Sequence, residues 1–217
     1  RVLQWRSLGN GLRRVAEVDS RYQRITLAEA DEQYSLLLNS ALWRTYPDPY
    51  QDARTAHLVL TQHPAPDHVL LLGGAAGGLP AEMLRHPVRS LTFVSLDPAV
   101  DRIIEPVLTA ADFRALRDHR VRRYYQDPRR FVKTAPGSYD VIIVAAPDPS
   151  TALLNRLYTV DFFNELRRIL APGGLVAVGL SSESAYISQA AAAYNGALYQ
   201  SLRRVFPHVL VVPGERN

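Results

Sequence analysis

Apolar and polar residues alternate over short distances near the start of this chain. Four stretches with strand-like composition, residues 14–18, 24–28, 34–38 and 41–45, are separated by the turn-forming pairs Asp19-Ser20, Asp31-Glu32 and Asn39-Ser40. Short β-prone stretches separated by such pairs are typical of strands that pair with their neighbours in sequence. The pattern therefore predicts a small antiparallel β unit.

After residue 67, strand-like and helix-like segments alternate regularly. The expected strands are 68–72, 90–96, 121–125, 139–145 and 175–180, and the expected helices are 79–85, 100–108, 128–133 and 160–170. Such alternation is typical of right-handed βαβ crossovers, and the nearly continuous apolar character of the strands fits burial on both faces. The predicted fold is therefore α/β, with a mainly parallel sheet covered by helices on both faces.

Other segments complete the predicted organisation. Residues 51–61 have helical composition, and Pro64 and Pro66 are expected to end that helix. Gly173-Gly174 is expected to stop the 160–170 helix. A long helix, 184–205, and a last strand, 208–212, follow. We divide the chain into an N-terminal β-hairpin unit, residues 1–49, and a larger α/β domain, residues 50–217.

Composition argues against several classes of site. The chain has no cysteine, so neither disulfides nor thiolate zinc sites are possible within it. Its six histidines show no paired ligand spacing within one predicted element, so no metal is expected. No run of eighteen apolar residues is present, so we expect no membrane insertion by this segment, and its start does not resemble a signal peptide. Since it begins with Arg1 and stops at Asn217, we expect a fragment of a longer protein.

Positive charge is concentrated in one segment. The chain carries a net charge of +4, and residues 117–130 contain six arginines together with Tyr124 and Tyr125. Interleaved arginine and tyrosine fit a nucleic-acid surface, but a solvated rim around a strand is the commoner explanation. Nucleic acid is therefore not an expected partner.

The sequence GGAAGG at residues 73–78 carries the first chemical signal. It directly follows the apolar run 69–72. Glycines allow a sharp turn and a close approach to a ligand, which the N–H groups of a following helix can also bind. A tight strand-to-helix packing turn explains such glycines equally well. The pattern leaves open a nucleoside site that includes Gly73, Gly74, Gly77 and Gly78.

Acidic residues follow the next three strands. Asp97 is placed either to accept hydrogen bonds from ribose hydroxyls or to cap the helix that begins at Pro98. Asp127 is placed either to accept from an adenine amino group or to cap the next helix. Asp148 lies between two prolines, where capping has little use, which favours a role in the cleft.

The order of these features resembles the spermidine synthase family, polyamine aminopropyltransferases with the Rossmann-like fold of many S-adenosylmethionine-dependent methyltransferases. The resemblance covers nearly the whole chain. The matching segments are Ser20-Arg21-Tyr22-Gln23 (S-P-Y-Q in the family), residues 38–43 (L-D/N-G-x-x-Q), 73–78 (G-G-G-D-G-G), 139–149 (Y-D-V-I-I-x-D-x-x-D-P) and 157–162 (L-Y-x-x-x-F). The tail, residues 205–215, resembles bacterial members that are fused to membrane-spanning segments.

This resemblance implies ligands, site contacts, an oligomeric state and a cellular location. The implied ligands are decarboxylated S-adenosylmethionine or S-adenosylmethionine, and a polyamine, without a metal. The implied contacts are Gln23 beside the thioether, Ser95 at the ribose position, Asp127 at the adenine position and Asp148 as the catalytic carboxylate that holds the amine acceptor. We further expect a homodimer formed through the N-terminal β unit and a cytoplasmic location, with tethering to the inner membrane in the full-length protein.

The chain departs from the family pattern at charged positions. The family's loop aspartate, which meets the aminopropyl amine, is Ala76; its ribose-binding glutamate is Ser95; and its presumed proton-accepting aspartate is Ala145. Trp43 replaces the hairpin glutamine, and D-E-x-x-Y-H-E reads D-P-Y-Q-D-A-R at residues 48–54. An unpaired buried cation is unfavourable by several kcal/mol. These changes indicate lost polyamine chemistry or a reassigned pocket.

Three functions remain open. The first is a non-catalytic or repurposed domain, a pseudoenzyme that retains an adenosyl nucleoside pocket. The second is an active aminopropyltransferase that uses Asp148. The third is a methyltransferase, because methyl transfer mainly needs positioning of the sulfonium and tolerates loss of a base.

Overall fold

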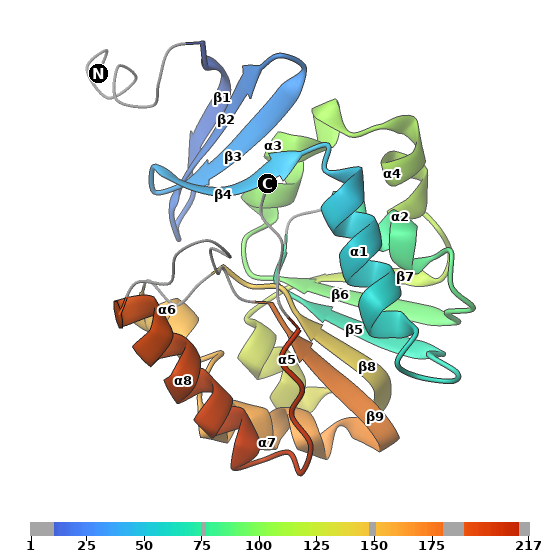
Figure 1. Cartoon of the computed structure of the whole chain (residues 1–217). Coiled ribbons are helices and arrows are strands. Elements are labelled where there is room, and N and C mark those ends of the chain that lie inside the picture. The colour runs from blue at the N-terminus through green and yellow to red at the C-terminus, as the bar shows by residue number, and fades with distance from the viewer. Residues whose placement is uncertain (1–10, 75–76, 148–150, 180–188, 213–217) are drawn as a thin grey trace.

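The computed structural model describes residues 11–74, 77–147, 151–179 and 189–212. A small antiparallel sheet lies beside the carboxyl ends of a larger parallel sheet, and helices cover both faces of the larger one (Figure 1). The antiparallel sheet comes first in the chain, as predicted. Its division from the rest at residue 49 as a separate unit stays a prediction.

The antiparallel sheet is a simple meander. Its strands are β1 (Arg13–Asp19), β2 (Arg24–Ala30), β3 (Gln33–Leu38) and β4 (Ala41–Tyr46), paired in that order. The two-residue turns Asp31-Glu32 and Asn39-Ser40 have positive φ, between 50° and 70°. Such turns match the twist of paired strands and favour Asn and Asp. The four predicted strands and both of these turns are confirmed.

The larger sheet is entirely parallel. Its strands are β5 (His68–Leu72), β6 (Ser90–Ser95), β7 (Val121–Tyr125), β8 (Tyr139–Val144) and β9 (Leu170–Val178), in the spatial order β7-β6-β5-β8-β9. The order reverses between β5 and β8, because the chain moves outward to β7 on one side and to β9 on the other. The predicted Rossmann-like α/β fold is confirmed.

Aspartate–proline pairs start three of the helices. Asp48, Asp97 and Asp127 each accept a backbone N–H of the following turn, and each is followed by proline at the first helical position. This is a favourable helix start, because proline has no N–H to satisfy there. The described helices are α1 (Pro49–Leu60), α2 (Leu79–Met83), α3 (Pro98–Ile104), the 3₁₀ helix η2 (Glu105–Val107), α4 (Ala110–Ala115), α5 (Pro128–Thr134), α6 (Ala152–Asn155), α7 (Val160–Arg168) and α8 (Gln189–Arg203).

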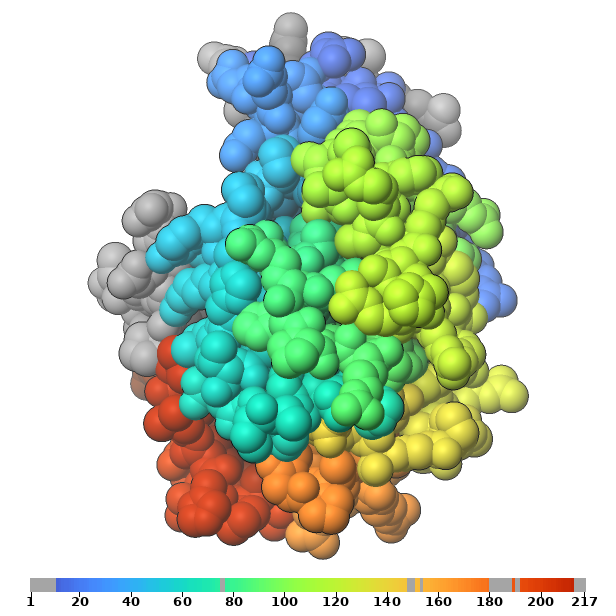
Figure 2. Space-filling view, turned by 90° about the vertical axis from the view of Figure 1, so that its right-hand side faces the viewer, coloured from blue at the N-terminus to red at the C-terminus, as the bar shows by residue number. Residues whose placement is uncertain are grey.

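Alternate residues of β5 enter different cores. Val69 and Leu71 pack with residues of α1 and α2, whereas Leu70 and Leu72 pack with α5, α7 and α8. A third cluster joins the antiparallel sheet to Val100 of α3. The face made by α1, α2 and α4 carries the N-terminal sheet at its upper end (Figure 2). The small sheet is therefore anchored on the α3 side of the parallel sheet.

The prediction for Gly173-Gly174 was wrong. Helix α7 ends at Arg168, and the two glycines lie inside β9, which begins at Leu170. Between the pairs Tyr139↔Leu170 and Val141↔Leu175 the register shifts, so β9 carries extra residues there. Gly173 has φ +78°, and a Cβ on Gly174 would lie 2.9 Å from the carbonyl oxygen of Asp140. The glycines allow an irregular bulge.

Other element predictions need correction. The apolar run 208–212 forms no strand, and its residues Leu210, Val211 and Val212 are exposed. Strand pairing needs a neighbouring strand, which hydropathy alone does not reveal. The expected helix 100–108 is divided between α3 and η2, while α4 and α6 are too short to give a helical pattern.

A histidine pair connects α1 to the segment after α2. The Nδ1 atom of His57 lies 2.7 Å from Nε2 of His86, and Glu82 approaches the other ring nitrogen of His57 at 3.3 Å. Partial burial lowers the pKa of His86, and the neighbouring His57 and Arg85 lower it further. The folded protein therefore favours neutral His86.

This pair predicts a pH-dependent contribution to stability. A pKa below the ordinary 6.5 in the folded state means that the contribution is complete above pH 6.5 and is lost as the pH falls through the folded-state pKa. We expect the stability advantage of the wild type over His86→Gln, measured by urea unfolding from about pH 7.5 to about pH 5, to shrink with falling pH. The matched control is His208→Gln, the same change on an exposed histidine. A constant effect of His86→Gln would contradict the prediction.

Candidate functional site

The carboxyl ends of β5 and β8 define the candidate site. These strands are neighbours, and the chain leaves them toward opposite edges of the sheet. In open α/β sheets, ligands bind in the crevice at such a reversal point. The glycine loop follows β5, and the segment from Ala145 follows β8, so both lie at this reversal point.

The first two glycines bring the loops after β5 and β8 together. Gly73 and Gly74 have φ of +75° and +86°, which other residues rarely adopt. A Cβ on Gly73 would lie 2.9 Å from the Cα of Ala146, and one on Gly74 would lie 3.6 Å from the Cβ of Ala145. Only a residue without a side chain fits at Gly73. The close contact is itself a packing reason for this glycine, one of the two interpretations that the sequence left open.

The last glycine lies against two carboxylates. A Cβ on Gly78 would be 2.6 Å from Oδ2 of Asp52 and 3.5 Å from Oδ1 of Asp112. Gly77 is buried beside it. Position 76, where the sequence lacks the family's loop aspartate, lies outside the described residues. The end of the loop is thus bordered by acidic side chains that come from α1 and α4.

Backbone hydrogen bonds hold the strand ends in position. The N–H of Gly73 donates to the carbonyl of Val94 at 2.8 Å, and the N–H of Ala145 donates to that of Leu72 at 2.8 Å. Ser95, the last residue of β6, is buried, and its carbonyl accepts from Gln126 at 3.0 Å. Ser95 therefore lies at the expected edge of the crevice, one strand away from the glycine loop.

Asp97 joins the antiparallel sheet to α3. Its Oδ1 accepts from the N–H of Ala99 at 3.0 Å, and its Oδ2 accepts from the hydroxyl of Ser20 at 2.6 Å. The same hydroxyl oxygen accepts from the N–H groups of Tyr22 and Gln23. The structure thus brings the Gln23 turn next to Asp97, which acts as a helix cap. A ribose contact by Asp97, and a thioether contact by Gln23, stay predictions.

Asp127 has a comparable structural role. It caps α5 by accepting from the N–H groups of Arg129 and Arg130, at 2.9 and 3.2 Å, and it forms an ion pair with Arg156. Of the two roles that the sequence left open for Asp127, these contacts are those of a helix cap. An adenine contact remains a prediction, since it would have to share a carboxylate that already has three donors.

Three further positions singled out in the sequence are Ala145, Asp148 and Trp43. Ala145 is half-buried at the end of β8 and faces Gly74. Asp148 lies outside the described residues. Trp43 packs against the apolar cluster between the antiparallel sheet and α3.

A buried polar network went unpredicted. Arg44 of β4 forms an ion pair with Asp52 of α1, which is only 2% exposed. The hydroxyl of Tyr46 donates to Oδ2 of Asp112 at 2.6 Å, and so does that of Thr109 at 2.7 Å. The Tyr46 hydroxyl also accepts from the N–H of Thr109 at 2.6 Å. Strand β4 is thereby connected to α1 and α4 beside the glycine loop.

The network changes the acidity of its members. Burial lowers the pKa of the Arg44 guanidinium, although the charges of Asp48 and Asp112 act in the opposite direction. Burial and the hydrogen bond to Asp112 raise the pKa of Tyr46. A sequence signal was available, because Asp52 shares one helix face with the buried Ala56 and Leu60, at intervals of four residues. A carboxylate on an apolar stripe indicates a buried polar partner.

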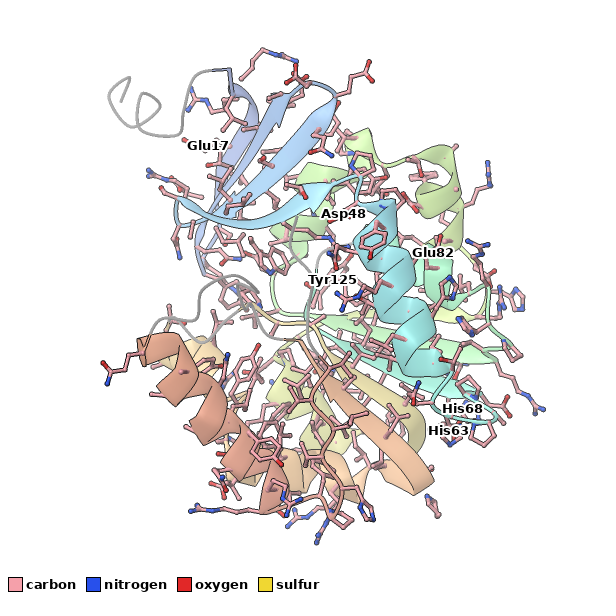
Figure 3. The ribbon with its side chains drawn as sticks, viewed as in Figure 1. Glu17, Asp48, His63, His68, Glu82 and Tyr125 are labelled. Carbon is pink, nitrogen blue, oxygen red and sulfur yellow. The ribbon has the colours of Figure 1, made fainter. Side chains whose placement is uncertain are left out.

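Several kinds of site find no support in the described part of the chain. Within it, no three His, Asp or Glu side chains are arranged to hold a metal ion. Figure 3 shows His63 and His68 at one end of the sheet and Asp48 and Tyr125 toward the other. No helix among the residues described combines the length and apolar character that crossing a membrane requires.

Acidic side chains of the same chain partly neutralise the basic segment, residues 117–130. Arg120 pairs with Asp118 at 2.9 Å and Arg129 with Glu165 at 2.8 Å. On β7, burial and the charge of Asp101 raise the pKa of Tyr125 to about 12. These contacts agree with an arginine-rich rim.

A family model and individual relatives of known name indicate the same protein family. The spermine/spermidine synthase domain matches residues 49–213. The polyamine aminopropyltransferase of Oceanobacillus iheyensis is 34% identical over 173 residues, which are 76% of this chain and 33% of the relative. Polyamine aminopropyltransferase 1 of Streptomyces coelicolor is 37% identical over 163 residues, 71% of this chain and 30% of the relative. The chain thus spans about a third of the length of these two relatives.

Solved structures support the same fold. A spermidine synthase in complex with the transition-state analogue AdoDATO superimposes with a TM-score of 0.75, at 23% identity, over 90% of this chain and 66% of the other. Spermidine synthase from Thermotoga maritima gives a TM-score of 0.71 at 22% identity, over 90% and 64%.

The contact between Gly73 and Ala146 predicts a stability effect. Gly73→Ala forces a Cβ into the second loop and an unfavourable φ, so we expect a loss of roughly 1–3 kcal/mol in the free energy of unfolding. Urea unfolding measures it. Gly137→Ala is the matched control, because a Cβ there meets nothing within 4 Å and no loss is expected. Equal stability of the two variants would show that the loops can separate without penalty.

The contacts of Asp97 predict that its removal destabilises the fold. Asp97→Ala removes a helix cap and the Ser20 contact, so we expect a loss of about 1–2 kcal/mol in the free energy of unfolding. Thermal and urea unfolding of Asp97→Ala, Ser20→Ala and the double variant measure the coupling between them. An Asp97→Ala protein as stable as the wild type would argue against the structural role and leave ribose binding as the reason for this aspartate.

Proposed function

Because the chain belongs to the spermine/spermidine synthase family, we propose that it binds an adenosyl nucleoside at the carboxyl ends of β5, β6 and β8, and has lost the proton acceptor that aminopropyl transfer needs. The ligand proposed is decarboxylated S-adenosylmethionine. In this proposal the domain senses or holds the nucleoside within a longer protein. Its expected homodimer and membrane attachment belong to the same proposal.

The proposal that the chain binds a nucleoside rests on the geometry of the glycine loop. Gly73 and Gly74 adopt backbone conformations that favour glycine, at the point where the strand order reverses. Such loops let a nucleoside approach the backbone closely. Ser95 lies at the end of the adjacent strand, where its short side chain leaves room but offers fewer acceptors than the family's glutamate. Weaker ribose binding is the expected consequence.

The loss of catalysis rests on one observation above all, the methyl group of Ala145. This residue directly follows β8 and faces Gly74. Aminopropyl transfer requires a neutral amine to attack the methylene beside a sulfonium, so a base must first remove a proton from the ammonium. A methyl group can neither accept that proton nor pair with the cation. The reaction would then proceed slowly or not at all.

An active aminopropyltransferase is the second candidate. The relatives at 34% and 37% identity are polyamine aminopropyltransferases, which favours it. In that case Asp148 would hold the amine acceptor and take the proton. Methyl transfer from S-adenosylmethionine is the remaining alternative, and the experiment below includes it.

One binding series and one product assay separate these functions. Calorimetry with decarboxylated S-adenosylmethionine, S-adenosylmethionine and methylthioadenosine should detect binding of the first and the third. Incubation with putrescine and decarboxylated S-adenosylmethionine should yield no spermidine, since Ala145 provides no base. The assay should be run in parallel on a catalytically active relative as a positive control.

The outcomes differ for each candidate. Spermidine formation that disappears in Asp148→Ala would establish the active enzyme and refute the loss of catalysis. Tight binding of S-adenosylmethionine alone would favour methyl transfer. If none of the three nucleosides binds, the nucleoside-binding proposal fails and an interaction domain remains.

A further inference from the structure

The polar network beside the glycine loop has more buried negative than positive charge. Asp52 and Asp112 are 2% and 8% exposed. Of the ion pairs in the described residues, only Arg44–Asp52 reaches either carboxylate. Tyr46 and Thr109 donate hydrogen bonds to Asp112, but both are neutral. Two carboxylates therefore share one guanidinium in a region that water hardly reaches, which is unfavourable unless another positive group arrives.

One carboxylate oxygen of the network lacks a hydrogen-bond partner. Arg44 donates to Oδ1 of Asp52, while Oδ2 is buried and accepts no hydrogen bond from the residues that the structure describes. Buried carboxylate oxygens nearly always have donors, and an unsatisfied one is destabilising. Asp52 thus has an unused acceptor position.

The unused position points at the loop where the nucleoside would bind. Oδ2 of Asp52 lies 2.6 Å from where a Cβ on Gly78 would be, and Oδ1 of Asp112 lies 3.5 Å from the same point. Gly78 is the last residue of the glycine loop and is itself partly exposed. The two oxygens from α1 and α4 therefore converge on one side of this residue.

A primary ammonium group fits this arrangement. It carries the missing positive charge, and its three N–H donors can serve more than one oxygen at the same time. We propose that Asp52, with Asp112 beside it, binds the terminal ammonium group of the aminopropyl arm of decarboxylated S-adenosylmethionine. This inference rests on the proposed nucleoside binding. It assigns a binding role to a residue that belongs to α1 rather than to the glycine loop.

A polyamine acceptor carries the same ammonium chemistry. The donor arm is favoured because the unused oxygen lies beside Gly78 of the glycine loop, which under the proposed function holds the donor nucleoside. The acceptor is therefore treated as a competing outcome that the experiment distinguishes.

The test compares two ligands that differ only in the ammonium group. These are 5′-(3-aminopropylthio)-5′-deoxyadenosine and 5′-propylthio-5′-deoxyadenosine, neither of which has a sulfonium charge. Calorimetry on the wild-type chain should show about 10-fold or more tighter binding of the amine, the size expected for a charge-assisted hydrogen bond. In Asp52→Asn the preference should fall to about one, with the affinity for the propyl compound unchanged. Asp118→Asn, which changes a carboxylate paired with Arg120, is the matched control and should keep the preference.

A measurement on the wild type covers the case in which Asp52→Asn does not fold. The trimethylammonium analogue keeps the charge but has no N–H donor, so it should lose most of the preference if a carboxylate oxygen accepts a hydrogen bond.

Three outcomes would overturn the inference. If the wild type binds the amine and the propyl compound equally, the ammonium site is refuted while nucleoside binding stands. If Asp52→Asn keeps the preference but weakens binding of putrescine to the complex with methylthioadenosine, the residue serves the acceptor instead. If neither nucleoside binds the folded wild type, the proposed function itself fails and the inference falls with it.

Discussion

The close contact between the loops after β5 and β8 is the constraint on which the rest of the structure depends. Gly73 can lie against Ala146 only because it has no side chain and adopts a left-handed φ. This contact holds the two loops together at the centre of the sheet, where the strand order reverses. The β5–β8 pair in turn positions both apolar cores, since alternate residues of these strands enter opposite layers. The same geometry brings the glycine loop and the segment after β8 to the place where the proposed ligand would bind.

Polar contacts connect the small sheet to this centre. Asp97 links the turn before β2 to α3, while Arg44 and Tyr46 link β4 to α1 and α4. Asp97 therefore both starts a helix and joins the two sheets, whereas Asp52 and Asp112 make their links from inside α1 and α4. Such double use explains why the acidic residues around the crevice are poor indicators of ligand contacts when they are considered singly. Asp52 differs from them, because part of its hydrogen-bonding capacity is unused.

The sequence predicted most of the fold and less of the site. Apolar runs indicated all five parallel strands, and Asp97-Pro98 and Asp127-Pro128 indicated two helix starts as one of two interpretations, because both signals are local. Gly173-Gly174 was misassigned because a helix stop and a bulge require the same residue. The partners of Asp52 and Asp112 depend on how β4, α1 and α4 meet, which no local pattern contains. The sequence thus offered candidate residues at the ends of the strands, but it could not show which residues already have partners.

The arrangement of the central strand also has a consequence for the order of folding. The antiparallel meander contains only contacts between neighbours in sequence and can form as soon as residue 46 has been synthesised. Strand β5 pairs with β8 through contacts such as Val69↔Val141, so one of its edges stays open until the chain has grown about seventy residues further. The nascent chain therefore carries an apolar open edge while these residues are added. An open edge of this kind can pair with another chain, so aggregation competes with folding during this interval.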